Sequence, residues 1–242
     1  MRASPHKPLA WNPKEIAFLG ANAALGPGED TQTLTTVKTR WVYNTLREVF
    51  IAPAGYVVKR FSHFPGRKDY RPVWRREHLA LQQLSGLSVP RTKGYLKVAH
   101  PGGESSVLYL RELVPGTPLV CVDDDQAAAM AYLLHAFHAR GVVTLDPQAE
   151  NFIAVDRDDG ALAFIDFGRA RCFSPRNPLL YANIGKELLK LKREGGLSPG
   201  RYAMFLDAYR SAGTYSRFNW AIIDSSFNFW QQRYARKNGV SG

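Results

Sequence analysis

Cysteine is scarce in this chain, with only Cys121 and Cys172 among 242 residues. Two cysteines do not form the disulfide framework of a small secreted protein, and no histidine or carboxylate partners stand at metal-ligand spacing from them. Long apolar runs are also missing, and the first eight residues lead into no apolar stretch. These absences predict a cytoplasmic protein without a secretory signal or a membrane-spanning segment.

Acidic residues are in the minority, since 21 Asp and Glu stand against 32 Lys and Arg and leave a formal charge of +11. This excess favours an anionic partner, namely phosphates, a nucleic acid or an acidic lipid surface. The basic residues are spread along the chain, and the densest group is Arg67, Lys68, Arg71, Arg75 and Arg76. No zinc finger, RNA-binding aromatic signature or heptad repeat accompanies them, so the sequence does not indicate nucleic-acid recognition.

The secondary-structure signals change along the chain. Residues 1–30 are rich in Pro, Gly, Asn and Ala and predict an N-terminal extension with one short helix. The remainder, 31–242, predicts an α+β fold with a strand-rich N-lobe (31–114) and a helical C-lobe (115–242). The predicted strands are 33–41, 46–52, 55–61, 94–99, 107–113, 152–155 and 162–165, and the predicted helices are 13–19, 72–84, 123–141, 179–193, 199–211 and 218–236.

Two short segments carry most of the functional information. Residues 145–151 read Leu-Asp-Pro-Gln-Ala-Glu-Asn, and residues 165–168 read Ile-Asp-Phe-Gly. Their order and spacing, with a predicted hairpin between them, are typical of the catalytic loop and the metal-binding turn of protein-kinase-like phosphotransferases. Asp146 would accept or orient the proton of the attacking hydroxyl, while Asn151 and Asp166 would hold the Mg²⁺ ions that bridge the phosphates of ATP. Each motif alone is also compatible with a turn or a helix cap.

The N-terminal half offers further parts of an ATP site. Lys59 ends a Tyr-Val-Val-Lys run in the third predicted strand and would reach the α- and β-phosphates, and Glu77 in the next helix would pair with it. The alternatives are a solvated strand lysine and an intrahelical ion pair of Glu77 with a nearby arginine. In residues 110–116 a predicted strand ends and the chain turns at Pro-Gly, as expected for an interlobe hinge. The backbone from Glu112 to Val114 would then receive the adenine edge, with an ordinary strand exit as the alternative.

With these motifs, the chain resembles the small bacterial lipopolysaccharide-core kinases, the family of heptose and Kdo (keto-deoxy-octulosonic acid) kinases. The resemblance implies transfer of the γ-phosphate of ATP to a sugar hydroxyl of the lipid-linked core oligosaccharide, at the cytoplasmic face of the inner membrane. The positive charge agrees, because that substrate and that membrane are both anionic. The resemblance also implies the roles given above to five residues, which are Lys59, Glu77, Asp146, Asn151 and Asp166. The matching segments are 57–61, 74–78, 88–91, 111–116, 134–142, 146–152 and 164–171.

Two features depart from the usual kinase pattern. No Gly-x-Gly-x-x-Gly precedes the strand lysine, and the turn at 41–45 contains no glycine, although Lys38, Arg40 or Arg47 could supply positive charge instead. Thr144 stands where kinases usually have a histidine before the catalytic aspartate. These departures leave a non-catalytic pseudokinase binding module open as an alternative.

An atypical protein kinase is the other alternative. No Ala-Pro-Glu follows Gly168, and helix-forming sequence begins by about residue 179. The segment between them leaves little room for a peptide-docking activation segment, which favours a small acceptor. Nothing in the sequence indicates the aminoglycoside pocket of an antibiotic phosphotransferase.

Two further patterns have competing interpretations. His135 and His138 have a spacing that could suit a metal, but no third ligand stands out and a packed helix end explains them better. The C-terminal helix combines aromatic and basic residues, and we favour a core helix with a basic exposed side over a membrane-surface helix. The residues concerned are Trp220, Ile222, Ile223, Phe227, Phe229 and Trp230, near Arg217, Arg233, Arg236 and Lys237.

Overall fold

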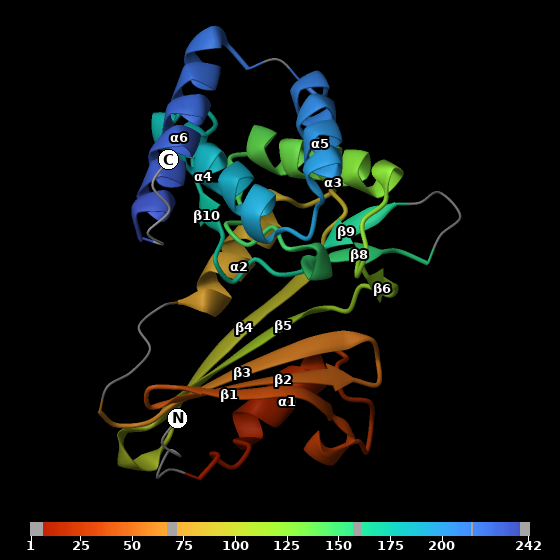
Figure 1. The fold of residues 1–242 in the computed structure, drawn as a ribbon. Helices are drawn as coiled ribbons and strands as arrows, with labels where there is room; N and C mark the ends of the chain where they lie inside the picture. Colours follow the sequence, from red (N-terminus) through yellow and green to blue (C-terminus); the bar gives the residue numbers. More distant parts are fainter. Residues whose placement is uncertain (1–6, 67–71, 157–160, 214, 238–242) are drawn as a thin grey trace. The chain divides into compact units, whose positions relative to one another are not determined.

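The computed structural model describes residues 7–66, 72–156, 161–213 and 215–237 (Figure 1). The basic residues Arg67, Lys68 and Arg71 lie outside the described residues. Two compact units divide the chain: Met1–Trp74 with Arg91–Leu113 form the first, and Arg75–Pro90 with Val114–Gly242 form the second.

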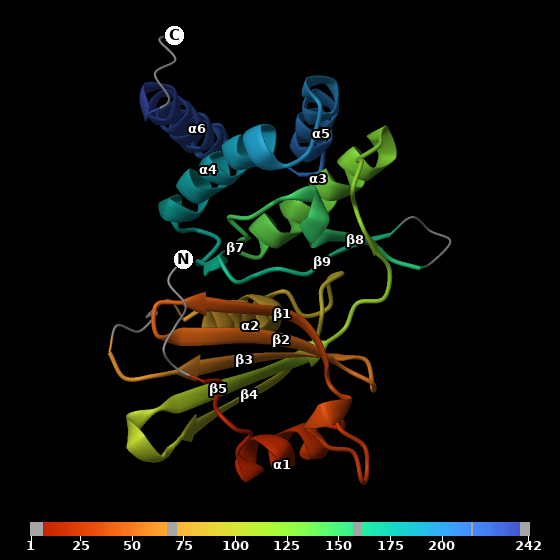
Figure 2. The ribbon, with the colours of Figure 1, turned by 60° about the horizontal axis from the view of Figure 1, so that its bottom comes forward.

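The first unit is built on an antiparallel sheet with the strand order β1-β2-β3-β5-β4. Helix α1 (Pro13–Ala21) covers one face of this sheet (Figure 2) and contributes Leu19 to a core with Val58 and Leu110. The helix begins at a capping box, in which Asn12 accepts from the Lys14 backbone and Glu15 accepts from the Asn12 backbone. The strands are β1 (Thr35–Val42), β2 (Thr45–Ala52), β3 (Tyr56–His63), β4 (Thr92–Ala99) and β5 (Ser105–Glu112).

A buried ion pair joins the N-terminal segment to this sheet. Arg60 on β3 lies 2.8 Å from the Glu15 carboxylate, and their side chains are only 2% and 0% exposed. The same guanidinium donates to the carbonyls of Leu9 and Ala10 and lies 4.3 Å from the centre of the Trp11 ring. Because a buried charge is costly without its partner, this cluster fixes the segment before and within α1 on the sheet.

The second unit is mainly helical. Helix α3 packs against α5, and α4 packs against α6 (Figures 1 and 2). In the core of this unit, the buried rings of Phe137, Phe152, Phe164 and Phe167 contact one another. The helices are α2 (Val73–Gln83, in this unit from Arg75), α3 (Asp124–Ala139), α4 (Pro178–Glu194), α5 (Pro199–Ser211) and α6 (Arg217–Lys237), and the short strands are β6 (Thr117–Pro118), β7 (Val142–Val143), β8 (Phe152–Ala154), β9 (Leu162–Phe164) and β10 (Arg171–Cys172).

The α+β class predicted from the sequence is confirmed, and every predicted helix and strand is present with ends shifted by at most two residues. Strands β6, β7 and β10 were not predicted. Each has two residues, which is too short to produce an alternating pattern.

Candidate active site

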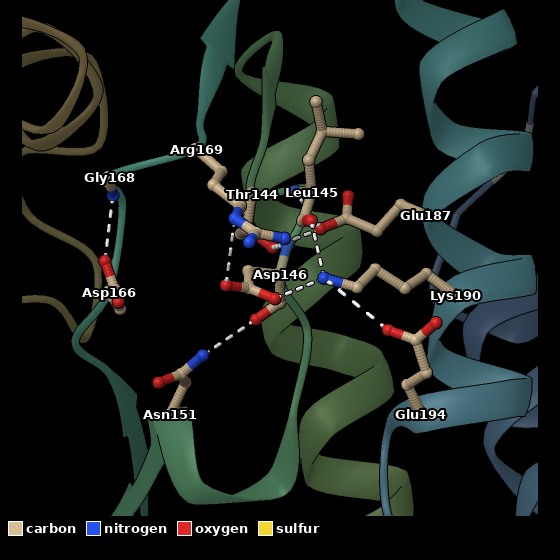
Figure 3. Close-up of polar contacts among 10 residues, drawn as sticks. All are labelled: Thr144, Leu145, Asp146, Asn151, Asp166, Gly168, Arg169, Glu187, Lys190 and Glu194. Atoms are coloured by element: carbon tan, nitrogen blue, oxygen red, sulfur yellow. Dashed lines mark hydrogen bonds and ion pairs between the residues drawn. The ribbon is translucent and has the colours of Figure 1, made fainter. Parts of the chain in front are cut away.

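The loop between β7 and β8 carries Asp146 and Asn151, and Asp166 follows β9 (Figure 3). The Asn151 side-chain amide donates to the Asp146 carbonyl at 2.9 Å. The Asn151 carbonyl in turn accepts from the Ile165 backbone at 3.0 Å. The structure therefore ties the two sequence motifs together through Asn151, and all three predicted residues belong to the second unit.

The donor set of Asn151 and Asp166 fits a hard cation. Because the Asn151 nitrogen is used by Asp146, its amide oxygen points away from Asp146 (Figure 3). The Asp166 carboxylate is oriented by the Gly168 backbone, which donates to Oδ1 at 2.9 Å. Among the described residues, no group of three or more His, Cys, Asp and Glu could hold a metal. An amide oxygen and a carboxylate suit Mg²⁺, which keeps several waters and takes phosphate oxygens as further ligands.

Two cations hold the Asp146 carboxylate, which is 17% exposed. Lys190 on α4 contacts Oδ1 and also donates to the Leu145 carbonyl at 3.2 Å. Arg169, directly after the Asp-Phe-Gly turn, has its Nε 3.5 Å from Oδ2 (Figure 3). Glu194 lies one turn further along α4, with a carboxylate oxygen 3.9 Å from Lys190 Nζ. The carboxylate is thus held from two sides, by Lys190, which lies outside the sequence motifs, and by Arg169, which lies in the matching segment 164–171 without an assigned role.

A buried polar network supports the loop that carries Asp146. Glu187 on α4 is fully buried and accepts from the Thr144 hydroxyl and from the Leu145 backbone, the latter at 2.8 Å. The other oxygen of Glu187 lies 2.8 Å from His138 Nε2. Leu145 has a φ of 57°, an unusual value for a side chain of this kind, so its backbone needs such support. Thr144 therefore has a structural partner of its own at the position where kinases usually have a histidine.

The network continues to α5. His138 Nδ1 lies 2.6 Å from the Tyr209 hydroxyl, and burial is the main cause that raises the pKa of Tyr209 well above its usual value. His135 lies beside the rings of Tyr209 and Tyr215, at centroid distances of 5.4 and 5.2 Å. Both histidines therefore have packing roles at the end of α3, in agreement with the interpretation preferred from the sequence.

Four cations lie on one face of the first unit's sheet. Val49 on β2 lies between Lys38 on β1 and Lys59 on β3. Arg40 on β1 lies opposite Arg47 on β2. Since opposed residues and every second residue share a face, Lys38, Arg40, Arg47 and Lys59 share the face away from α1. Like charges directly opposite each other repel, so an anion bound between Arg40 and Arg47 would stabilise this face.

The remaining predicted residues are placed as follows. Glu77 is fully buried on α2 in the second unit, whereas Lys59 belongs to the first, and their pairing stays a prediction. Glu112 ends β5, with its carboxylate 3.4 Å from Lys93. The second unit resumes at Val114, so the chain leaves the first unit within the segment that was predicted as a hinge. The contact of Val114 with adenine stays a prediction.

Sequence reasoning missed Glu187 and Lys190, and it included Arg169 in the matching segment 164–171 without giving it a role. Glu187 had a detectable signal, because it falls on the apolar side of α4, between Ile184 and Leu191 in helical spacing. A carboxylate at a core position usually has a structural or functional partner. The contacts of Lys190 and Arg169 with Asp146 had no such signal, since lysines and arginines are common outside sites as well.

No protein-family model matches the chain, and no curated protein matches its sequence. Among solved structures, it is similar to WaaP in complex with acyl carrier protein, with 19% identity and a TM-score of 0.55, over 90% of each chain. It is also similar to the amicoumacin kinase hAmiN in complex with AMP-PNP, Ca²⁺ and Ami, with 12% identity and a TM-score of 0.57, over 90% of this chain and 83% of the other. At these identities the likeness concerns the fold: the chain has the protein-kinase-like fold, with an antiparallel-sheet N-lobe and a helical C-lobe.

Proposed function

We propose that the protein is an ATP-dependent phosphotransferase that phosphorylates a sugar hydroxyl, of heptose or Kdo, in the lipopolysaccharide core. The observation that carries the proposal is the bond from the Asn151 amide to the Asp146 carbonyl, which joins the proposed base to the proposed metal ligand. The Asn151 backbone also accepts from Ile165, next to Asp166, so the bond links the loop to the Asp-Phe-Gly turn, which a separate turn or helix cap would not require.

Phosphoryl transfer depends on positioning and on charge, and the chain offers groups for each. Asp146 would accept or orient the proton of the acceptor hydroxyl, held in place by Lys190 and Arg169. Asn151 and Asp166 would hold Mg²⁺, which when bound neutralises phosphate charge. The nucleotide and divalent cation in the hAmiN structure support this choice of ligands.

The phosphates of ATP would bind to the cationic face of the first unit's sheet. Lys59 would reach the α- and β-phosphates, with Glu77 as its partner. Arg40 and Arg47 would take over the role that a glycine-rich loop has elsewhere, because the β1–β2 turn has Tyr43 at a φ of 54° and no glycine. Glu112 and Val114 would contact adenine through their backbone.

The choice of a sugar acceptor rests on the resemblance of the sequence and on the short segment after the Asp-Phe-Gly turn. Helix α4 begins at Pro178, so few residues are left after Gly168 for docking a peptide. None of the helices in the described part of the chain combines the length and the apolar character needed to cross a bilayer. The lipid-linked substrate and the charge of +11 support peripheral attachment to the cytoplasmic face of the inner membrane.

The test is transfer of labelled γ-phosphate from Mg-ATP to purified lipopolysaccharide core. We expect label in the core with the wild-type protein and with Asp207→Asn, an exposed control on α5, but not with Asp146→Asn. Label that appears on a protein and never on the core would instead identify a protein kinase. If the folded protein transfers no label and does not bind Mg-ATP at millimolar concentration, it is a non-catalytic module.

A further inference from the structure

An apolar groove lies on the surface between α4 and α6 of the second unit. Its lining includes Phe218, Ile222, Phe229 and Trp230 from α6 and Ala182 from α4. Phe218 is 68% exposed and Phe229 is 56% exposed, although both are large aromatic side chains. A contiguous apolar surface of this kind, exposed to water, marks a site where an apolar partner binds.

Helix α6 is fixed to the domain by Ile223 and by Ser226, which also lines the groove. Ile223 is buried in the core of the second unit, and the Ser226 hydroxyl donates to the Ala182 carbonyl at 2.6 Å. The two helices approach closely at Gly185, where an added Cβ would lie 2.2 Å from the Ile223 carbonyl oxygen. The core-helix interpretation from the sequence thus describes α6 around Ile223, while Phe218 and Phe229 stay exposed along the groove.

A cluster of cations forms one edge of the groove. Lys186 Nζ lies 4.0 Å from the centre of the Trp230 ring, and the Arg233 guanidinium lies 5.1 Å from the same ring. The pKa of Lys186 is lowered by burial and by the nearby charges of Arg171, Arg233 and Lys190. Arg171 Nη1 donates to the amide oxygen of Asn183, at 3.4 Å. Among residues that the structure describes, no carboxylate forms an ion pair with Arg171, Lys186 or Arg233.

The two features together define an amphipathic surface. We infer that the α4–α6 face docks on an anionic phospholipid membrane, with lipid acyl groups in the groove and lipid phosphates against Arg171, Lys186 and Arg233. Aromatic and aliphatic side chains beside uncompensated cations are the composition of a membrane-interface surface, because the rings bury apolar area while the cations meet the negative headgroups.

This surface adjoins the catalytic loop. Lys186 and Lys190 are one helical turn apart on α4 and therefore share a side of the helix. Lys190 contacts Asp146, so a membrane docked at Lys186 would present anionic head groups beside the proposed base. The inference extends the membrane attachment in the proposed function, and it is independent of phosphoryl transfer.

The experiment is co-sedimentation of the full chain with phosphatidylcholine vesicles, with and without phosphatidylglycerol. We expect binding only to the anionic vesicles, and a loss of about fivefold in partitioning for each charge removed in Lys186→Gln and Arg233→Gln. The double variant Phe218→Ser/Phe229→Ser removes apolar contacts at exposed positions and should also release the protein. Matched controls are Val120→Ser/Tyr132→Ser, which are exposed apolar positions elsewhere, and Lys14→Gln/Arg75→Gln.

Several outcomes would overturn the inference. They are no binding to anionic vesicles, equal losses in the groove variants and in their controls, and a concentration-dependent dimer that the groove variants abolish, which would make a second copy of the chain the occupant. Phosphate transfer to a deacylated, soluble core acceptor separates this inference from the proposed function. A groove variant that loses vesicle binding but keeps that transfer supports both, whereas vesicle binding without any transfer by the wild-type protein supports the docking surface alone.

Discussion

Lys190, on α4, contacts the carboxylate of Asp146, which lies 44 positions earlier in the loop between β7 and β8. The same ammonium group donates to the Leu145 carbonyl at 3.2 Å, so one side chain holds both the side chain of the proposed base and the backbone before it. Because the loop has no regular secondary structure around Asp146, such a clamp from a helix gives the carboxylate a defined position.

Replacement of Lys190 tests this clamp. We expect Lys190→Met to lower kcat about 100-fold, as a small misplacement of a catalytic group does, with little change in the KM for ATP. Lys190→Arg should recover part of the activity, since it keeps a cation at this position. Steady-state kinetics would measure both constants, with Lys192→Gln, an exposed neighbour on α4, as the control. A rise in KM with an unchanged kcat would show that Lys190 binds nucleotide instead.

The cationic face of the first unit leads to a prediction about ATP affinity. Arg40→Gln should raise the KM for ATP at least about tenfold, because one charge-assisted contact to phosphate contributes about 1.5–3 kcal/mol. It should not lower the free energy of unfolding, because it removes the repulsion from Arg47 across the strand pair. Kinetics and urea denaturation would measure the two effects, with Thr39→Gln on the other face of β1 as the control. An unchanged KM would contradict a role of this face in phosphate binding.

The sequence predicts those features of the structure that depend on local patterns, and it does not predict contacts that depend on how distant elements pack. The acidic start of α3 at Asp123 and the β-branched and aromatic residues of β2 and β3 mark these elements locally, so the helices and strands were predicted closely. The residues of the candidate site that belong to motifs, Asp146 and Asp166, were also visible. Lys190 could not be predicted, because its contact with the loop depends on how α4 packs against β7, and this packing leaves no local pattern.

The buried network gives a stability prediction. Glu187→Ala would leave the Thr144 hydroxyl, the Leu145 amide and His138 Nε2 without their acceptor inside the core. Since each unsatisfied buried group costs about 1–3 kcal/mol, we expect a loss of at least about 3 kcal/mol in the free energy of unfolding. Tyr209→Phe removes two hydrogen bonds, to His138 and to Tyr215, and should cost about 2 kcal/mol. Chemical denaturation would measure both, and equal losses would contradict the central place of Glu187.

Acid should destabilise the folded chain through its partly buried histidines. Burial, and for His135 also the charge of His138, lowers the pKa of His78 and His135 below the usual value of 6.5. Between that value and the lower folded one, the unfolded chain binds protons that the folded chain does not, so stability falls as the pH falls through this range. Thermal unfolding at pH 7.5 and 5.5 should show a lower Tm at the acid pH, and a smaller difference in His135→Gln.

The buried pair of Arg60 and Glu15 predicts that the N-terminal segment is needed for the stability of the first unit. Glu15→Ala leaves a buried guanidinium without its carboxylate, and breaking a buried pair in this way costs about 3–5 kcal/mol. Lys14→Gln, an exposed change on the same helix, should have an effect within about 0.5 kcal/mol. Urea denaturation followed by tryptophan fluorescence would report the change, because Trp11 lies against Arg60. Equal midpoints for the two variants would show that the segment is dispensable, and the ion pair would then have no measurable part in holding it on the sheet.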